Sequence, residues 1–257
     1  MTKKRLLLID ADVFAYKAAA AVERITTFDE ENYFPIASIA EALNAFDNLI
    51  DDVIEHLECS RKDCVYCFST DHNGGFRREV LPSYKTNRDG KPRPIILQRL
   101  REWLINDPFN TIYIRDGLEA DDCLGILATQ KSYKKGYHKI IVSVDKDMKS
   151  IPCDFFNAMH PELGIMHISE EEADRWFLTQ TLTGDTTDGY SGCPSVGPKT
   201  AAKLLDESCT WETVVKAYEK AGLSEEEAIT QARVARILRA SDYDFKNKKV
   251  KLWTPTS

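Results

Sequence analysis

The sequence lacks any apolar stretch that could cross a membrane, because no run approaches the roughly 18 consecutive apolar residues that a spanning helix requires. It also lacks a secretory-type leader, since the polar and basic residues 1–5 lead directly into the short apolar run 6–9. There is no internal repeat and no low-complexity tract. We therefore expect a globular, cytoplasmic protein without a membrane partner.

The cysteines lack the pattern of a disulfide framework. The seven cysteines are odd in number and irregularly spaced, unlike those of small secreted folds. Cys64 and Cys67 form a C-x-x-C pair, but they lie in an apolar run, and no second pair or nearby histidine completes a zinc site. We expect reduced thiols, with these two buried in a strand.

An excess of positive charge is lacking as well. The chain has 34 basic and 41 acidic residues, a formal charge of −7, whereas nucleic-acid-binding proteins usually carry a basic surface. Nine of the acids, however, fall in the short motifs described below, and without them the balance is 34 to 32, or +2. The net charge therefore does not exclude a nucleic acid as partner.

Short apolar runs alternate with helical patterns over the first two thirds of the chain. Strands are expected at 6–9, 65–68, 111–114 and 139–144, and helices at 36–57, 95–105 and 120–134. This alternation predicts an α/β fold with a mostly parallel central sheet flanked by helices. Further helices are expected at 170–182, 199–205, 213–220 and 225–238, with a strand or a packed tail at 249–253. We therefore expect an α/β domain over residues 1–168 and a helical region over 169–257.

Aspartates follow three of the expected strands. Asp10, Asp71 and Asp145 each come directly after an apolar run or close behind it. The carboxyl ends of parallel strands share one edge of a sheet, and ligands bind at that edge. We expect these three side chains to point into the same crevice.

Further acids occur in closely spaced groups. These are Glu119, Asp121 and Asp122 at the start of an expected helix, Asp147 beside Asp145, and Asp185 with Asp188 in a Gly-containing loop. Each group alone is more often a helix cap or a turn. Brought together, however, the carboxylates would repel one another, and divalent cations would offset that repulsion. Oxygen-only ligands favour Mg²⁺ or Mn²⁺, so the pattern predicts two or more metal ions that activate water against a phosphodiester, although a phosphatase would also fit.

Two other segments suit nucleic acid. Residues 76–93 contain six basic residues with Phe and Tyr between them, a composition that can neutralise phosphates and stack on bases. A solvated surface loop is the alternative. Residues 192–202 form a Gly-rich turn before a helix that Pro198 would begin, so that free backbone N–H groups could face a phosphate. An ordinary helix start is the alternative there.

With these motifs in order, the chain resembles the flap endonuclease and 5′-to-3′ exonuclease family, in particular the compact bacteriophage enzymes and the 5′ nuclease domain of bacterial DNA polymerase I. The resemblance covers nearly the whole chain and implies a PIN-like fold. It implies a helical arch at about 72–93, through which a 5′ single strand passes, and a helix-hairpin-helix element at about 184–206, which grips duplex DNA with a bound K⁺. It also implies nine catalytic metal-site carboxylates: Asp10, Asp71, Glu119, Asp121, Asp122, Asp145, Asp147, Asp185 and Asp188.

The resemblance assigns roles to other groups too. Lys85 is similar to the basic residue that reaches the scissile phosphate. DNA contacts are expected from Lys17, Arg77, Arg78, Tyr84, Lys85, Arg88, Gly192, Ser195, Val196, Gly197, Lys199 and Thr200. Asp10 is followed by Ala11-Asp12 where many members have Gly then Ser or Asn, and Lys17 replaces a common arginine, which limits it to a point-charge contact. Residues 23–35 carry no motif that we can interpret.

The sequence therefore predicts a monomeric, Mg²⁺-dependent, structure-specific 5′ nuclease, which is an exonuclease and a flap endonuclease. Expected substrates are DNA with 5′ ends, flaps or nicks, and RNA primers in hybrids. Replication, repair or host DNA degradation would use such an enzyme, in the host cytoplasm if a phage encodes it. The alternatives are a PIN-type ribonuclease acting on RNA or RNA·DNA hybrids, and a non-catalytic DNA-junction-binding module, against which the complete set of acids argues. A small-molecule phosphatase would not need the arch.

Overall fold

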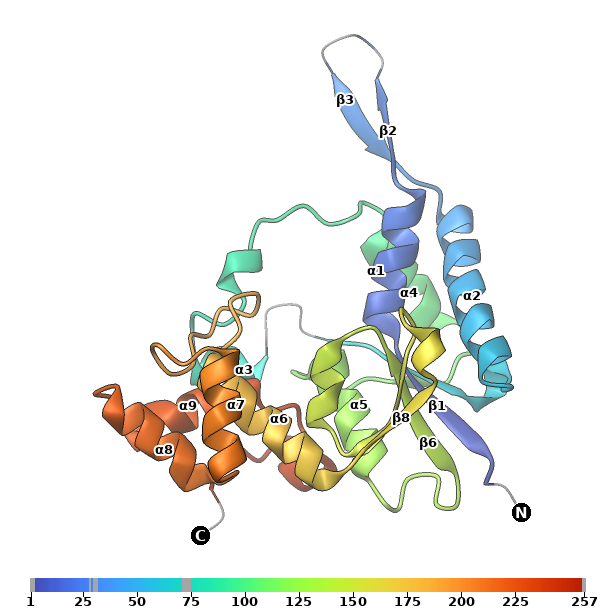
Figure 1. Cartoon of the computed structure of the whole chain (residues 1–257). Helices are drawn as coiled ribbons and strands as arrows, with labels where there is room; N and C mark the ends of the chain where they lie inside the picture. Colours follow the sequence, from blue (N-terminus) through green and yellow to red (C-terminus); the bar gives the residue numbers. More distant parts are fainter. Residues whose placement is uncertain (1–2, 28, 30–31, 71–74, 256–257) are drawn as a thin grey trace.

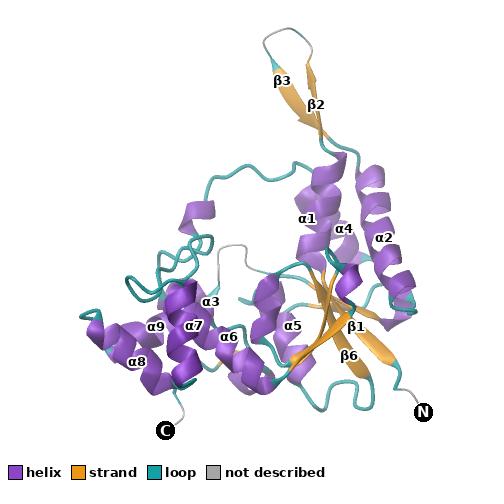
Figure 2. Cartoon of the chain, viewed as in Figure 1, coloured by secondary structure: helices purple, strands orange, loops and turns teal. Residues whose placement is uncertain are grey.

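A six-stranded sheet forms the centre of the protein, with the strand order β5-β4-β1-β6-β7-β8 (Figures 1 and 2). Its strands are β1 (Arg5–Asp10), β4 (Cys64–Cys67), β5 (Ile112–Tyr113), β6 (His138–Ser143), β7 (Cys153–Asn157) and β8 (Ile165–Ile168). β8 is antiparallel to β7, and the other neighbours are parallel, which confirms the predicted sheet. The computed structural model describes residues 3–27, 29, 32–70 and 75–255.

Strand β1 is apolar throughout because both of its faces are buried. Leu7 and Ile9 pack against α1 (Ala11–Val22), α2 (Ile39–His56) and α4 (Leu97–Asn106). Leu6 and Leu8 face the opposite layer, where α5 (Ala120–Thr129) packs. Burial on both faces is typical of a strand within a parallel sheet, and it accounts for the continuous apolar run.

A group of helices follows the sheet along the chain. It contains α6 (Glu170–Thr183), α7 (Pro198–Glu207), α8 (Trp211–Lys220) and α9 (Glu225–Ala235), which share a separate apolar core (Figure 2). The C-terminal segment is both a strand and a packed tail. β10 (Lys249–Val250) pairs with β9 (Tyr243–Asp244), and the Trp253 ring lies 5.2 Å from Phe177 and 4.9 Å from Trp211.

Several elements differ from those expected. α5 ends at Thr129 rather than near residue 134, because Gln130 takes an extended conformation at φ −72° and ψ 99°. Lys134 and Gly136, which adopt positive φ, then turn the chain toward β6. β7, β8 and the hairpin of β2 (Arg24–Thr27) and β3 (Tyr33–Ile36) were not predicted. The hairpin projects beyond α1 and α2 in Figure 1.

The segment expected to be a helical arch is mostly irregular. Within residues 75–96, only α3 (Phe76–Val80) is α-helical, and residues 86–88 form a 3₁₀ turn. Three prolines, at positions 82, 92 and 94, account for this, since proline removes a helical hydrogen bond and clashes with the preceding turn. Across the described part of the chain, no helix combines the length and apolar character needed to span a bilayer.

Candidate active site at the carboxyl edge of the sheet

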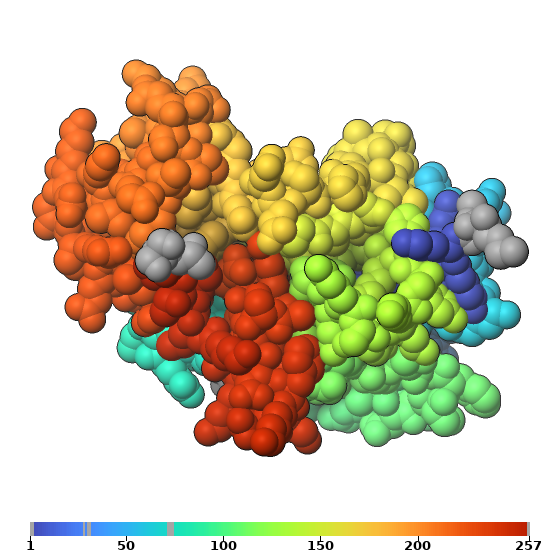
Figure 3. Space-filling model, turned by 90° about the horizontal axis from the view of Figure 1, so that it is seen from below, coloured from blue at the N-terminus to red at the C-terminus, as the bar shows by residue number. Residues whose placement is uncertain are grey.

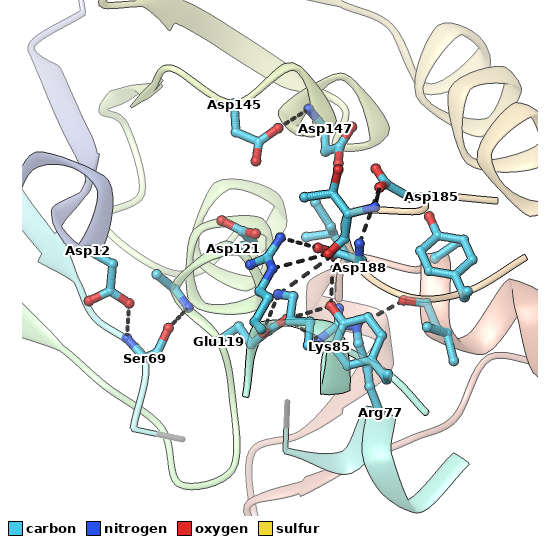
Figure 4. Close-up of a pocket in the computed structure, with 18 of the residues that line it drawn as sticks. Asp12, Ser69, Arg77, Lys85, Glu119, Asp121, Asp145, Asp147, Asp185 and Asp188 are labelled. Atoms are coloured by element: carbon cyan, nitrogen blue, oxygen red, sulfur yellow. Dashed lines mark hydrogen bonds and ion pairs between the residues drawn. The ribbon is translucent and has the colours of Figure 1, made fainter. Parts of the chain in front are cut away.

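A cavity of about 380 Å³ opens at the carboxyl edge of the sheet, beside the helical region (Figure 4). The acids that line it come from four segments of the chain: Asp10, Asp12, Glu119, Asp121, Asp145, Asp147, Asp185 and Asp188. In Figure 4, Asp121 and Asp145 lie on one side of the cavity, and Asp185 and Asp188 lie on the other. Asp10 and Asp145 therefore meet as the strand pattern predicts, whereas Asp71 lies outside the described residues.

Asp10 is the most deeply buried acid in this cavity, with 1% of its surface exposed. It ends β1 and caps α1, where its Oδ1 accepts a hydrogen bond of 3.4 Å from the N–H of Val13. Its Oδ2 accepts a 2.6 Å bond from the Ser143 hydroxyl at the end of β6. Burial, with a smaller contribution from Asp145, raises the Asp10 pKa to about 6.

Asp145 and Asp147 lie at the 3₁₀ turn that follows β6. Asp145 Oδ1 accepts a 2.8 Å hydrogen bond from the Asp147 N–H, which orders the turn. Asp147 Oδ1 is buried and has no hydrogen-bond partner among the residues that the structure describes. Burial and then the charge of Asp145 raise the pKa of Asp147 to about 7. A buried carboxylate oxygen without a partner, next to another acid, is destabilising, and a bound cation would offset that cost.

Asp121 shows the same crowding. It projects from the first turn of α5, and its pKa lies well above the ordinary value. Burial is the largest cause, followed by the charges of Asp10 and Asp145. Burial and two acids from other segments therefore make Asp121 harder to ionise.

The loop after α6 presents Asp185 and Asp188. Asp185 Oδ1 accepts hydrogen bonds from the N–H groups of Thr187 at 2.7 Å and Asp188 at 3.3 Å. Gly184 begins the loop at φ +66°, and a Cβ there would lie 2.3 Å from the carbonyl carbon of Ser191. Only glycine fits this close approach, which turns both acids toward the cavity.

Basic side chains enter the cavity from residues 84–88. Lys85 Nζ lies 2.5 Å from Glu119 Oε1 and 3.6 Å from Asp188 Oδ2, and Arg88 forms an ion pair with Asp188. The Tyr84 hydroxyl lies 3.0 Å from Glu119 Oε2. Burial opposes ionisation of Glu119, but Lys85 and Arg77 outweigh it and lower its pKa. Burial likewise acts against the Lys85 cation, but Glu119 and Asp188 outweigh it and raise the Lys85 pKa.

These ion pairs alter the expected cluster. Among the described residues, no three acids stand close enough together to enclose a metal ion. Lys85 and Arg88 engage Glu119 and Asp188, and the ammonium group of Lys85 balances part of the negative charge. The donors that remain are oxygens only, with one of them unpaired at Asp147, so the residues present suit a hard divalent cation.

Comparison with known proteins identifies the family. The family described as 5′-3′ exonuclease, N-terminal resolvase-like domain, matches residues 5–175. This chain belongs to the 5′-3′ exonuclease family. The exonuclease of Escherichia phage T7 is 30% identical over 98% of this chain and 94% of its own length, and the exodeoxyribonuclease of Enterobacteria phage T3 is 29% identical over 99% and 94%. The relatives named here are nucleases, which agrees with the expectation of an enzyme.

A solved structure confirms the fold of this family member. The phage T5 flap endonuclease, in a pseudo-enzyme-product complex with DNA and metal ions, has a TM-score of 0.62. The match covers 90% of this chain and 89% of that one. At 15% sequence identity, it establishes a shared fold. The predicted α/β class and the predicted family are therefore confirmed.

Asp122 and Arg77 take a different place in this family member from the one expected. Asp122 has no exposed surface and does not line the cavity; it forms two hydrogen bonds of 2.7 Å with the Arg77 guanidinium. It also accepts a 3.0 Å bond from the Leu238 N–H. Arg77 is 2% exposed and donates to the carbonyl oxygens of Val234 and Arg236. The two side chains contact each other, and Arg77 also reaches the wall of the cavity, where it lies 3.2 Å from Glu119 Oε2.

The other expected DNA contacts lie at several places on the surface. Arg78 bonds to the Tyr84 carbonyl and to Asp89, and Lys17 lies outside the cavity and donates to the Met159 thioether. Ser195, Gly197, Lys199 and Thr200 are exposed at the start of α7. The N–H groups of Gly192 and Val196 are already bonded, to Gln231 and to the Cys193 carbonyl. The described turn therefore offers fewer free backbone donors than the motif suggests.

Three residues beside the cavity were not assigned to the site from the sequence, and they bond to one another and to the start of α5. Asp12 Oδ2 accepts a 2.9 Å bond from the Ser69 N–H and forms an ion pair with Arg101. Arg101 also donates to the Ser69 carbonyl at 2.6 Å, and the Ser69 hydroxyl accepts from the Ala120 N–H at 2.8 Å. Asp12 was visible as a departure from the family pattern. Arg101 and Ser69 gave no local signal, because their partners are distant in the sequence.

Asp122→Ala is expected to lower the free energy of unfolding by about 3–5 kcal/mol, because it removes the two-bond partner of the buried Arg77 charge and leaves it the weaker contact with Glu119. The double variant Arg77→Met, Asp122→Ala removes both charges and should cost less than the sum of Arg77→Met and Asp122→Ala made singly. Urea denaturation of the four proteins measures this coupling. Strictly additive losses would show that the pair does not interact as described.

In EDTA, the free energy of unfolding should fall as pH rises from about 4 to above 7. Burial raises the pKa of Asp10 to about 6 and that of Asp147 to about 7, from an ordinary 3.8. The native state therefore holds more protons than the unfolded chain in this window, which makes the slope against pH negative. Asp147→Asn cannot titrate and should show a shallower slope in urea denaturation between pH 4 and 8. Equal slopes would contradict the assignment.

Proposed function

We propose that this chain is a divalent-metal-dependent 5′ nuclease that hydrolyses DNA phosphodiester bonds as a 5′-to-3′ exonuclease and flap endonuclease. The observation that carries the proposal is the meeting of acids from four chain segments at one cavity, with Lys85 among them. The T7 relative is named an exonuclease, and the T5 neighbour is a flap endonuclease in complex with DNA and metal ions. Both names support this reaction and this substrate.

Mg²⁺ is the proposed cation, with Mn²⁺ as a substitute and two or more ions in the working state. The residues proposed to hold them are Asp10, Glu119, Asp121, Asp145, Asp147, Asp185 and Asp188, together with Asp71, which lies outside the described residues. When bound, the cations supply Lewis acidity toward the phosphate and the attacking water. Their charge would also relieve the crowding that raises the pKa values of Asp10, Asp121 and Asp147.

Lys85 is proposed to stabilise negative charge on the scissile phosphate. Its raised pKa keeps the amine protonated, and its Nζ already lies between Glu119 and Asp188. Cations bound to these acids would free Lys85 to turn toward a phosphate oxygen. The centroid of the Tyr84 ring lies 4.9 Å from Lys85 Nζ, so a cation–π interaction also stabilises the ammonium group.

The 5′ strand is proposed to reach the cavity through a neighbouring groove of about 670 Å³. The two hollows adjoin, since Asp12, Arg88, Arg93 and Thr187 line both of them, and together they are the proposed path. Arg88 and Arg93, with Lys91 beside them, would contact phosphates along this path. Duplex DNA would dock on the exposed start of α7, where K⁺ is the proposed ligand of the turn.

Digestion of 5′-labelled flap, nicked and blunt DNA tests the proposal. Short labelled products should form with Mg²⁺ and be absent in EDTA. A matched RNA flap should be cut more slowly than the DNA flap. Absence of any Mg²⁺-dependent product would indicate a non-catalytic junction-binding protein, and a preference for the RNA flap would indicate a ribonuclease.

Asp145→Asn and Asp185→Asn should each lower kcat by at least about 100-fold, because each removes a charge that metal binding needs. DNA affinity measured in EDTA should change little. Asp116→Asn is the matched control, since Asp116 follows β5 but is exposed and does not line the cavity. Parallel losses of affinity and turnover in the Asp145 and Asp185 variants would contradict their assigned role.

A further inference from the structure

Lysines gather at the edge of the sheet opposite the cavity. Lys3 and Lys4 precede β1, and the loop 130–137, which contains Lys131, Lys134 and Lys135, leads into β6. β1 and β6 run parallel, so these segments lie at the amino ends of strands whose carboxyl ends reach the active site. The two segments touch, since the His138 N–H donates to the Lys4 carbonyl at 2.8 Å.

A second group of lysines lies on the neighbouring C-terminal hairpin of β9 and β10, whose tip at Phe245 and Lys248 lies beside Arg115 and Asp116, after β5. The exposed lysines of the hairpin are Lys246, Lys248, Lys249 and Lys251. The Ala240 N–H, just before the hairpin, donates a 2.8 Å hydrogen bond to Thr129 Oγ1, directly before the loop 130–137. Figure 3 shows the red C-terminal segment, the lime loop region and the blue N-terminal residues on one face of the molecule.

We name the exposed lysines of residues 3–4, 131–135 and 246–251 the lysine face. These thirteen residues contain nine lysines and no acid, and without the nine the formal charge of the chain would be −16 instead of −7. Within the described part of the chain, Lys4 is the lysine of this face that forms an ion pair, with Asp63 at 2.9 Å. The nearby Asp154 is engaged by His138 and His167. The face therefore presents concentrated positive charge on a protein that is otherwise strongly acidic.

The chemistry of the face fits a phosphodiester backbone. Lysine is a flexible point charge without the fixed fork of arginine, so a row of lysines suits repeated phosphates without reading sequence. Three separate segments contribute, which suits an extended polyanion better than a single phosphate group. The concave surface beside residues 131–135 is lined by five lysines and two histidines, together with Asp154, Glu170 and apolar side chains such as Tyr133 and Ile168. An acidic peptide is the other polyanion that such a surface could bind, and the experiments below distinguish it from DNA.

We propose that the lysine face binds a second stretch of DNA, outside the catalytic cavity. The proposal rests on the proposed function, since it takes DNA to be the substrate. A long substrate held at this face would keep its 5′ end at a high local concentration near the cavity. Short substrates that reach only the cavity would gain nothing from it.

Binding of a covalently closed circular duplex in EDTA tests the face, because such DNA has no 5′ end or flap to enter the cavity. The triple variant Lys131→Gln, Lys134→Gln, Lys135→Gln should bind at least about 10-fold more weakly at about 0.1 M salt, and the slope of log K against log salt should become shallower by about 2.7. The control Arg24→Gln, Arg99→Gln, Lys149→Gln removes three exposed charges away from the lysine face and should bind like wild type.

Cleavage of a short DNA flap with Mg²⁺ separates this proposal from the proposed function. The lysine variant should cut the short flap at the wild-type rate. A wild-type protein that fails to cut it would overturn the proposed function, whatever the circle binding shows. Unchanged circle binding by the lysine variant would overturn the second DNA site, and so would loss of poly-glutamate binding alone, which would assign the face to an acidic protein.

Discussion

Repulsion between carboxylates at one edge of the sheet is the constraint on which the rest of the structure depends. Asp10, Asp121 and Asp147 have raised pKa values because they are buried beside other acids. Such an arrangement lowers stability in itself, so positive charge must offset it. Lys85 supplies part of that charge from a loop far away in the sequence, and divalent cations are proposed to supply the remainder.

Buried ion pairs and hydrogen bonds connect the elements that carry these acids. Arg77 of α3 joins Asp122 of α5 to the carbonyl oxygens of Val234 and Arg236 at the end of α9, which connects the sheet domain to the helical region. Asp12, Arg101 and Ser69 connect α1 and α4 to the first turn of α5. Buried pairs of this type are strongly destabilising to break, so they hold crowded acids in place.

The sequence was sufficient to predict those elements whose position follows from a local pattern of residues. A continuous apolar run such as 6–9 is buried on both faces, and an acid after it must lie at the carboxyl edge, as Asp10 does. Prediction from the sequence failed where distant contacts decide. Asp121 and Asp122 are neighbours in sequence, yet the first faces the cavity and the second faces Arg77. The hairpin of β2 and β3 and the irregular chain around Pro92 had no counterpart in the motifs.

Anomalous scattering from crystals grown with Mn²⁺ would show whether the carboxylates bind divalent cations, because it locates the ions without relying on turnover. The account predicts peaks within the cavity, between the carboxylates of Asp121, Asp145 and Asp147 and those of the loop at Asp185. The peaks should weaken in Asp147→Asn crystals. A cavity without any peak at saturating Mn²⁺, or ions bound only at other surfaces, would contradict the account.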